Sequence, residues 1–172
     1  MDAITFASTI ALFTLVIIAV VEDVRFMRIR NRLILIGLVL GLAFRILEEG
    51  SQGVISYAIG VIFPVILLFL LFLARILGAG DIKLFSMIGG FVPLEQLIVC
   101  VGCSFLAGGI LAFILLFIRG YALQSLTEGL RYMGQVAFGQ LGEYEGRKKK
   151  EHLMHFSVAI LLGLLITKGG FI

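Results

Sequence analysis

Two aspartates differ in position from the other acidic residues of the chain. Asp23 lies just after an apolar run at residues 4–21, and Asp81 lies just before an uncharged segment at residues 84–94. Ionisable side chains at the edge of a membrane-spanning segment are energetically costly and tend to serve a function. If both segments cross a membrane, we expect the two carboxyl groups to meet at one end of the same helix bundle.

Two neighbouring carboxyl groups can hydrolyse a peptide bond. Like-charge repulsion acts against double ionisation, so such a pair holds one proton over a wide pH range. The ionised carboxylate takes a proton from water as the water attacks a peptide carbonyl, while the protonated partner hydrogen-bonds the carbonyl oxygen. The sequence therefore predicts Asp23 and Asp81 as a catalytic pair of the aspartic-protease kind.

The residues before Asp81 support this prediction, because they read Gly-Ala-Gly-Asp from Gly78. Gly78 and Gly80 have no Cβ, so the chain can turn tightly there and a second backbone can approach the carboxylate. A helix that begins at this point also places its positive dipole end at Asp81, which favours the ionised carboxylate.

Other kinds of catalytic site have less support. Residues 151–155 read Glu-His-x-x-His, which is neither zinc-protease motif, and the chain has two histidines. Cys100 and Cys103 form a Cys-x-x-Cys inside the uncharged run 97–118. A zinc ion needs four ligands, and these two thiols supply only two of them. We therefore interpret the cysteines as small apolar residues, and we expect no metal and no cofactor.

The composition indicates what must position the aspartates. Of the 172 residues, 60% are hydrophobic and 15% are charged, against roughly 45–50% and about 25% in soluble domains. This excludes a soluble enzyme and a free nucleic-acid-binding module. Backbone amides in lipid must pair within the chain, and no strand-like alternation is present, so we expect a single all-α domain over residues 1–172 with about six transmembrane helices. The apolar segments are 4–21, 33–47, 54–74, 84–94, 97–118 and 156–172.

The basic residues predict the orientation. Twelve of the fourteen lysines and arginines lie in the odd-numbered connections at 22–32, 75–83 and 119–155. By the positive-inside rule these connections are cytoplasmic, both termini lie outside, and both aspartates face the cytoplasm. We expect residues 119–155 to form a cytoplasmic or interfacial connector, and the net charge of +3 to favour the lipid bilayer over nucleic acid.

Two helix-level features complete this model. The segment 84–94 is short for a span, which implies a thinned bilayer or a water-filled cavity beside it. Gly37 and Gly41 form a small-xxx-small pair, which is typical of close helix packing.

The two aspartate motifs resemble those of a known family. Residues 23–31 resemble the Asp-x-Arg-(three residues)-Ile-Pro-Asn signature of type IV prepilin peptidases, and Gly-Ala-Gly-Asp-Ile-Lys-Leu at 78–84 resembles their Gly-x-Gly-Asp-(Val/Ile)-Lys-Leu motif. The resemblance implies an aspartic endopeptidase of the inner membrane that cleaves the short basic leader from prepilin-like precursors at the cytoplasmic face. Asp23 and Asp81 match the family's catalytic aspartates, and Lys83 matches the lysine that follows the second.

The chain departs from the family pattern in two respects. Arg30 stands where the family has proline, which puts the local turn after Asp23 in doubt. The larger family members carry an insertion with paired Cys-x-x-Cys motifs and also methylate the new N-terminus of the product. This sequence has no such insertion, so the resemblance implies a short form that acts as a peptidase only.

Several roles stay open at this stage. Lys83 could attract an acidic residue of the precursor, tune the pKa of Asp81 or mark a helix end. Asn31 could hydrogen-bond near Asp23, but we expect it to cap the second helix. The main alternative function is a small proton- or cation-coupled transporter that uses the same two aspartates. Against it, both acids lie near one membrane face and no internal repeat is evident.

Overall fold

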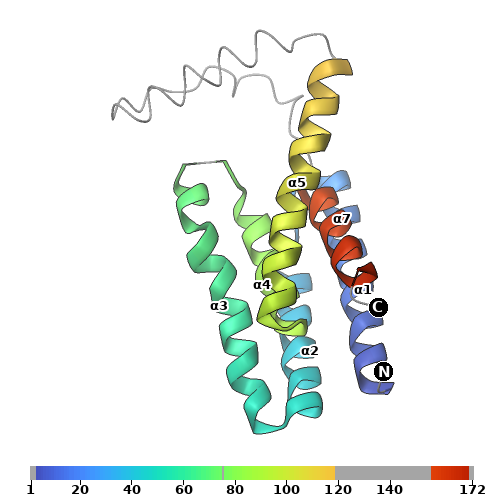
Figure 1. Cartoon of the computed structure of the whole chain (residues 1–172), viewed down its shortest axis with the longest axis vertical. Coiled ribbons are helices and arrows are strands. Elements are labelled where there is room, and N and C mark those ends of the chain that lie inside the picture. The colour runs from blue at the N-terminus through green and yellow to red at the C-terminus, as the bar shows by residue number, and fades with distance from the viewer. Residues whose placement is uncertain (1–2, 75, 119–155, 171–172) are drawn as a thin grey trace. The chain divides into compact units, whose positions relative to one another are not determined.

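The computed structural model describes residues 3–74, 76–118 and 156–170 (Figure 1). These residues form helices and no strand, so the predicted all-α class is confirmed for them. The predicted connector at 119–155 lies outside the described residues. The helices are α1 (Ala3–Phe26), α2 (Asn31–Glu49), α3 (Ser51–Leu73), α4 (Ala79–Phe91), α5 (Leu94–Ile118) and α7 (Phe156–Gly169).

The chain divides into two compact units. Residues 1–108 and 155–172 form the first, and residues 109–154 form the second, of which the described part is the last portion of α5. All contacts discussed below lie within the first unit.

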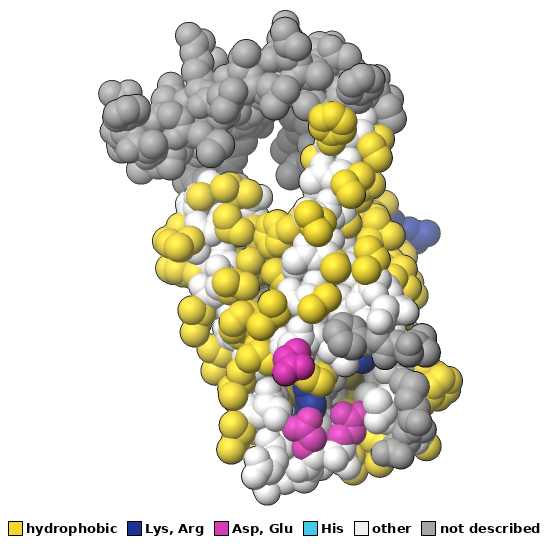
Figure 2. Space-filling model, viewed as in Figure 1, with side chains coloured by type: hydrophobic (Ala, Val, Ile, Leu, Met, Phe, Trp, Pro, Cys, Tyr) yellow, Lys and Arg dark blue, Asp and Glu magenta, His cyan; other side chains and the backbone are white. Residues whose placement is uncertain are grey.

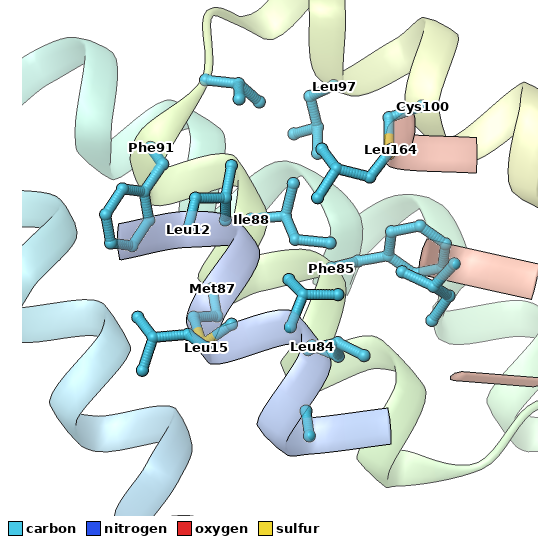
Figure 3. Close-up of a cluster of buried hydrophobic side chains, with 14 of the residues drawn as sticks. Leu12, Leu15, Leu84, Phe85, Met87, Ile88, Phe91, Leu97, Cys100 and Leu164 are labelled. Carbon is cyan, nitrogen blue, oxygen red and sulfur yellow. The ribbon is translucent and has the colours of Figure 1, made fainter. Parts of the chain in front are cut away.

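The short helix α4 is the centre of the first unit. It packs against α1, α2, α3 and α7, and every residue from Leu84 to Phe91 is buried. Figure 3 shows how Phe85, Met87 and Ile88 project from α4 into a hydrophobic cluster with side chains of the neighbouring helices. A helix of this length spans only about 20 Å at 1.5 Å per residue. It can be short because other helices, rather than lipid, cover it.

The bounds of α4 correct one detail of the sequence interpretation. The sequence places the fourth apolar segment at 84–94, but α4 runs from Ala79 to Phe91. Asp81 lies in its first turn, and so stands at a helix N-terminus as expected. Pro93 lies in the connection to α5, because a proline has no N–H to continue a helix.

Glycines allow the neighbours of α4 to come close. A Cβ on Gly60 of α3 would collide with the carbonyl group of Gly89 in α4. On α2, a Cβ on Gly37 would collide with the Met87 side chain, and one on Gly41 would lie 3.2 Å from the Gly90 carbonyl. The predicted close packing at Gly37 and Gly41 is therefore confirmed, and its partner is α4.

The outer surface of these helices is apolar. Large exposed hydrophobic side chains cover α1, α2, α3 and α5, and Figure 2 shows many hydrophobic side chains, in yellow, on the face that it presents. Three helices, α1, α3 and α5, are long and apolar enough to cross a membrane, and α7 is a shorter apolar helix. A surface of this kind is stable against lipid tails and not against water.

Candidate active site

Asp23 lies in the last turns of α1, where the helix ends at Phe26. The next residue, Met27, has a left-handed backbone with φ of 51°. Its N–H donates to the Asp23 carbonyl oxygen at 2.8 Å, which closes the helix end in the manner of a C-terminal cap. The chain can then turn at once and start α2 at Asn31.

Asp81 is held at the other helix end by the glycine that precedes it. Gly78 is the N-cap residue of α4, and its N–H donates to Oδ2 of Asp81 at 3.3 Å. A Cβ on Gly78 would lie 3.1 Å from the same oxygen, so a larger residue would press on the carboxylate. A Cβ on Gly80 would only touch the Ile29 side chain at 3.8 Å. The first glycine of the motif thus has a packing reason in this structure, whereas a Cβ at the second would make an ordinary contact with Ile29.

The negative charge of Asp23 acts on the carboxyl group of Asp81 although the two residues are far apart in sequence. The pKa of Asp81 is raised from 3.8 to about 6, first by burial and second by the negative charge of Asp23, while the Gly78 N–H acts in the opposite direction. Burial thus outweighs the Gly78 N–H at the start of the helix, so the ionised form of Asp81 is not favoured as expected. The two predicted aspartates therefore lie near enough for their charges to interact, and both side chains are half-buried.

A serine that sequence reasoning missed completes this cluster. The Oγ of Ser157 in α7 donates a hydrogen bond of 2.6 Å to Oδ2 of Asp23, and Ser157 is fully buried. One signal in the sequence could have found it, because a polar side chain in the apolar segment 156–172 needs a hydrogen-bond partner inside the bundle.

The two predicted support residues contact each other. The Lys83 ammonium group donates to Oδ1 of Asn31 at 3.0 Å, which links the start of α2 to the start of α4. The expectation that Asn31 caps α2 is wrong. The N-cap position is Arg30, which makes no side-chain cap bond, and Asn31 is already inside the helix.

Arg30, the residue at the family's proline position, ties the turn to α1. Its backbone N–H donates to Oε2 of Glu22 at 3.0 Å, and its guanidinium group lies 3.6 Å from the other oxygen of that carboxylate. The same group lies over the Phe26 ring at 5.3 Å. Its φ of −71° is one that proline also adopts. The turn is therefore formed here without proline, through contacts that proline could not make.

The residues considered for metal binding are the two cysteines and the two histidines of residues 151–155. Cys100 and Cys103 are free thiols in α5, and Cys100 is buried. Residues 151–155, with their two histidines, lie outside the described part of the chain. Across residues 3–74, 76–118 and 156–170, no three His, Cys, Asp or Glu side chains gather as a metal-binding group.

The arrangement can hold and move one proton. One carboxyl group has a pKa raised to about 6, and the other accepts a short hydrogen bond from a buried hydroxyl. Such a pair can present an acid and a base to the same water molecule.

Comparison with known proteins points to one family. A family model described as the type IV leader peptidase family matches residues 10–113, more than half of the chain and a range that includes both aspartates. No curated protein and no solved structure matches the chain.

Proposed function

We propose, because the chain belongs to the type IV leader peptidase family, that it is a membrane-embedded aspartic endopeptidase that cleaves the leader from prepilin-like precursors. The observation that carries the proposal is the placement of the two motif aspartates: Asp81 lies in the first turn of α4, where the Gly78 N–H donates to it, and it lies near enough to Asp23 to interact with its charge. Two carboxyl groups that interact electrostatically can share one proton, as this kind of catalysis requires.

The environments of the two acids suggest a division of roles. Asp81 is the acid, because burial and the charge of Asp23 favour its protonated form. Asp23 is the base, because the Ser157 hydroxyl donates to its carboxylate. Water attacks the scissile carbonyl carbon and gives a proton to Asp23, and Asp81 donates its proton to the carbonyl oxygen. The tetrahedral intermediate then collapses: the C–N bond breaks, the leaving amine takes the proton from Asp23, and one hydroxyl of the intermediate returns a proton to Asp81 as the carbonyl group forms again.

The motif residues support this geometry. Gly78 makes room for the carboxylate of Asp81 and donates its N–H to it. Lys83 and Asn31 hold the starts of α4 and α2 together. No metal and no cofactor take part in this scheme.

The membrane arrangement is part of the proposal. We place α2, α4 and α7 across the membrane together with the three longer apolar helices, so that the basic connections and both aspartates face the cytoplasm and both termini lie outside. The whole chain then acts as one peptidase domain in the inner membrane, with residues 119–155 as its connector. Its partners are the precursor and the bilayer, and it transfers no methyl group.

Cleavage of a candidate prepilin by the purified protein in detergent tests the proposal. We expect Asp23→Asn and Asp81→Asn each to fold and to lose cleavage by at least a thousandfold, because each removes half of the pair. Glu95→Gln, a change of an exposed acid at the start of α5, should cleave as the wild type does.

Either outcome of this experiment is informative. Wild-type rates in one of the two aspartate variants would refute the paired mechanism. Absence of cleavage by the wild type, together with proton uptake into liposomes that both variants abolish, would support the transporter instead.

A further inference from the structure

The start of α7 lies against α5 through one aromatic side chain. Phe156 is the first residue of α7, and its ring packs on Gly108 of α5, which is buried. A Cβ on Gly108 would lie 2.7 Å from Cε2 of the Phe156 ring and 3.2 Å from Cδ2. Because a real Cβ does not approach another atom as closely as 2.7 Å, the ring can lie here only against a glycine.

Two further aromatic rings contact Phe156. The ring centroid of Phe105 in α5 lies 5.3 Å from that of Phe156. The ring centroid of Phe85 in α4 lies 6.4 Å away, with the two rings edge to face, and Figure 3 shows Phe85 directed from α4 toward the α7 ribbon. Aromatic pairs at such separations stabilise a structure beyond the area that they bury. Phe156 therefore joins the start of α7 both to α5 and to α4, the helix that carries Asp81.

A second glycine contact fixes the position of α7 along α5. Gly163 follows Phe156 by about two helical turns, so both residues lie on the same face of α7. A Cβ on Gly163 would collide with Oγ of Ser104 and lie 2.9 Å from the Cys100 carbonyl oxygen. With close contacts at two levels of one face, α7 cannot slide or rotate against α5 without a collision.

The residue after Phe156 reaches the first aspartate. Ser157 faces a different side of α7, because successive helical residues are separated by about 100°. Its hydroxyl donates to Oδ2 of Asp23 in α1 at 2.6 Å. Gly108→Ala requires the Phe156 ring to move by about 0.7 Å, from 2.7 Å to the 3.4 Å of an ordinary contact. A displacement of that size at Ser157 takes its bond beyond the roughly 2.5–3.0 Å of hydroxyl hydrogen bonds.

We propose that Phe156 is a positioning residue for the peptidase reaction. Packed against Gly108, it fixes the start of α7 so that Ser157 holds the Asp23 carboxylate in its reactive orientation. The inference rests on the proposed function, in which Asp23 is the base. Phe156 has no polar group of its own and acts through Ser157, and displacement of a catalytic group by about 1 Å can lower a rate a hundredfold.

Gly108→Ala in the full chain tests the proposal. We expect the kcat for prepilin cleavage in detergent to fall at least fivefold with little change in KM. Gly102→Ala in the same helix is the matched control, because a Cβ on Gly102 meets nothing within 4 Å, and it should cleave as the wild type does. A wild-type kcat in a folded Gly108→Ala would overturn the proposal.

A combination of variants tests whether the effect passes through Ser157. We expect Gly108→Ala to lower kcat in the wild-type background and to add little to the loss in a Ser157→Ala background. Losses that multiply would overturn the proposal, because they would show a route independent of the hydroxyl. Phe156→Leu removes the ring contacts without adding bulk and should behave in the same way. It replaces Gly108→Ala if thermal unfolding shows that variant to be unfolded.

Infrared spectroscopy provides a measurement that needs no substrate. The carboxylate stretching bands of Asp23, identified by difference against Asp23→Asn, report the hydrogen bonding of this group. We expect Gly108→Ala and Ser157→Ala to shift these bands in the same direction, and Gly102→Ala to leave them in place. Unchanged bands in Gly108→Ala would overturn the positioning role. If the wild type does not cleave prepilin, that failure counts against the proposed function alone, and the bands still decide whether Phe156 positions Asp23.

Discussion

At the scale of single residues, the environments of the two aspartates differ. Asp81 is held by a backbone N–H and has a raised pKa because of burial and the charge of Asp23. Asp23 receives a hydrogen bond from a buried serine of α7. Two identical side chains can therefore act as an acid and a base, and two predictions follow from this difference.

The first prediction concerns Ser157. Ser157→Ala removes the hydroxyl that orients the Asp23 carboxylate, and a hydrogen bond to a charged group contributes about 1.5–3 kcal/mol. We expect the kcat for prepilin cleavage to fall by about tenfold or more with little change in KM. Ser157→Thr should recover part of the rate, because it keeps a hydroxyl.

Ser104→Ala is the control for Ser157→Ala. Ser104 is also fully buried, but its hydroxyl donates to the Cys100 carbonyl oxygen within α5 and plays no part in the aspartate cluster. A loss of kcat as large in Ser104→Ala as in Ser157→Ala would argue for a packing effect only.

The second prediction concerns pH. Cleavage needs a proton on Asp81, whose pKa is about 6, so we expect the rate to fall as the pH rises through about 6. In Asp23→Asn the neighbouring charge is gone, and the carboxyl band of Asp81, identified by infrared difference against Asp81→Asn, should titrate at lower pH. An unchanged titration midpoint would show that the two groups do not interact.

The same raised pKa has a consequence for stability. The folded protein holds the Asp81 proton more tightly than the unfolded chain does, because the pKa rises from 3.8 to about 6 on folding. The free energy of unfolding therefore decreases as the pH rises from about 4 to about 6, and the penalty is complete above that range. Perturbed pKa values of this kind cluster at functional sites.

At the scale of helices, α4 positions the second aspartate through its packing. It is enclosed by four other helices, and its closest approach is to α3, where Gly60 meets Gly89. The turn between α1 and α2 is held by the contacts of Arg30 with Glu22 and Phe26. Both motifs thus depend on how their helices are packed and connected.

The third prediction tests this packing. Gly60→Ala places a methyl group against the backbone of α4, and overpacking of this kind costs about 1–3 kcal/mol. We expect a lower thermal midpoint in detergent and reduced cleavage, since α4 carries Asp81. Gly102→Ala in α5 has open space around it and should unfold at or above the wild-type temperature. Equal midpoints in the two variants would contradict the close contact of α3 with α4.

At the scale of the whole molecule, polar groups occur at the ends of helices with apolar outer surfaces. The proposed orientation places Arg28, in the turn after α1, in the cytoplasm and Ser51, at the start of α3, outside. Both residues are exposed.

The fourth prediction tests this orientation by thiol labelling of intact cells. In a background with Cys100→Ala and Cys103→Ala, a membrane-impermeant maleimide should label Ser51→Cys at once and Arg28→Cys only after the membrane is permeabilised. Labelling in the reverse order would place the aspartates on the outer side and would be incompatible with cleavage at the cytoplasmic face.

Much of the fold and part of the site could be read from the sequence, because their signals are local. Runs of apolar residues indicate where the helices lie, and the described residues are all-α as predicted. The close packing predicted at Gly37 and Gly41 is also found. Asp23 and Asp81 were selected from their position beside apolar segments, and family membership agrees with their motifs.

The rest was decided by tertiary structure, because it depends on contacts between residues distant in sequence. No local sequence pattern indicates that Ser157 donates a hydrogen bond to Asp23. Nor does one indicate that Asn31 accepts a hydrogen bond from Lys83 instead of capping its own helix. The packing of Phe156 against Gly108 likewise arises only where α5 and α7 meet. Hydrophobicity along the chain determines which segments form helices, whereas the identity of the neighbouring side chains is determined only when those helices pack together.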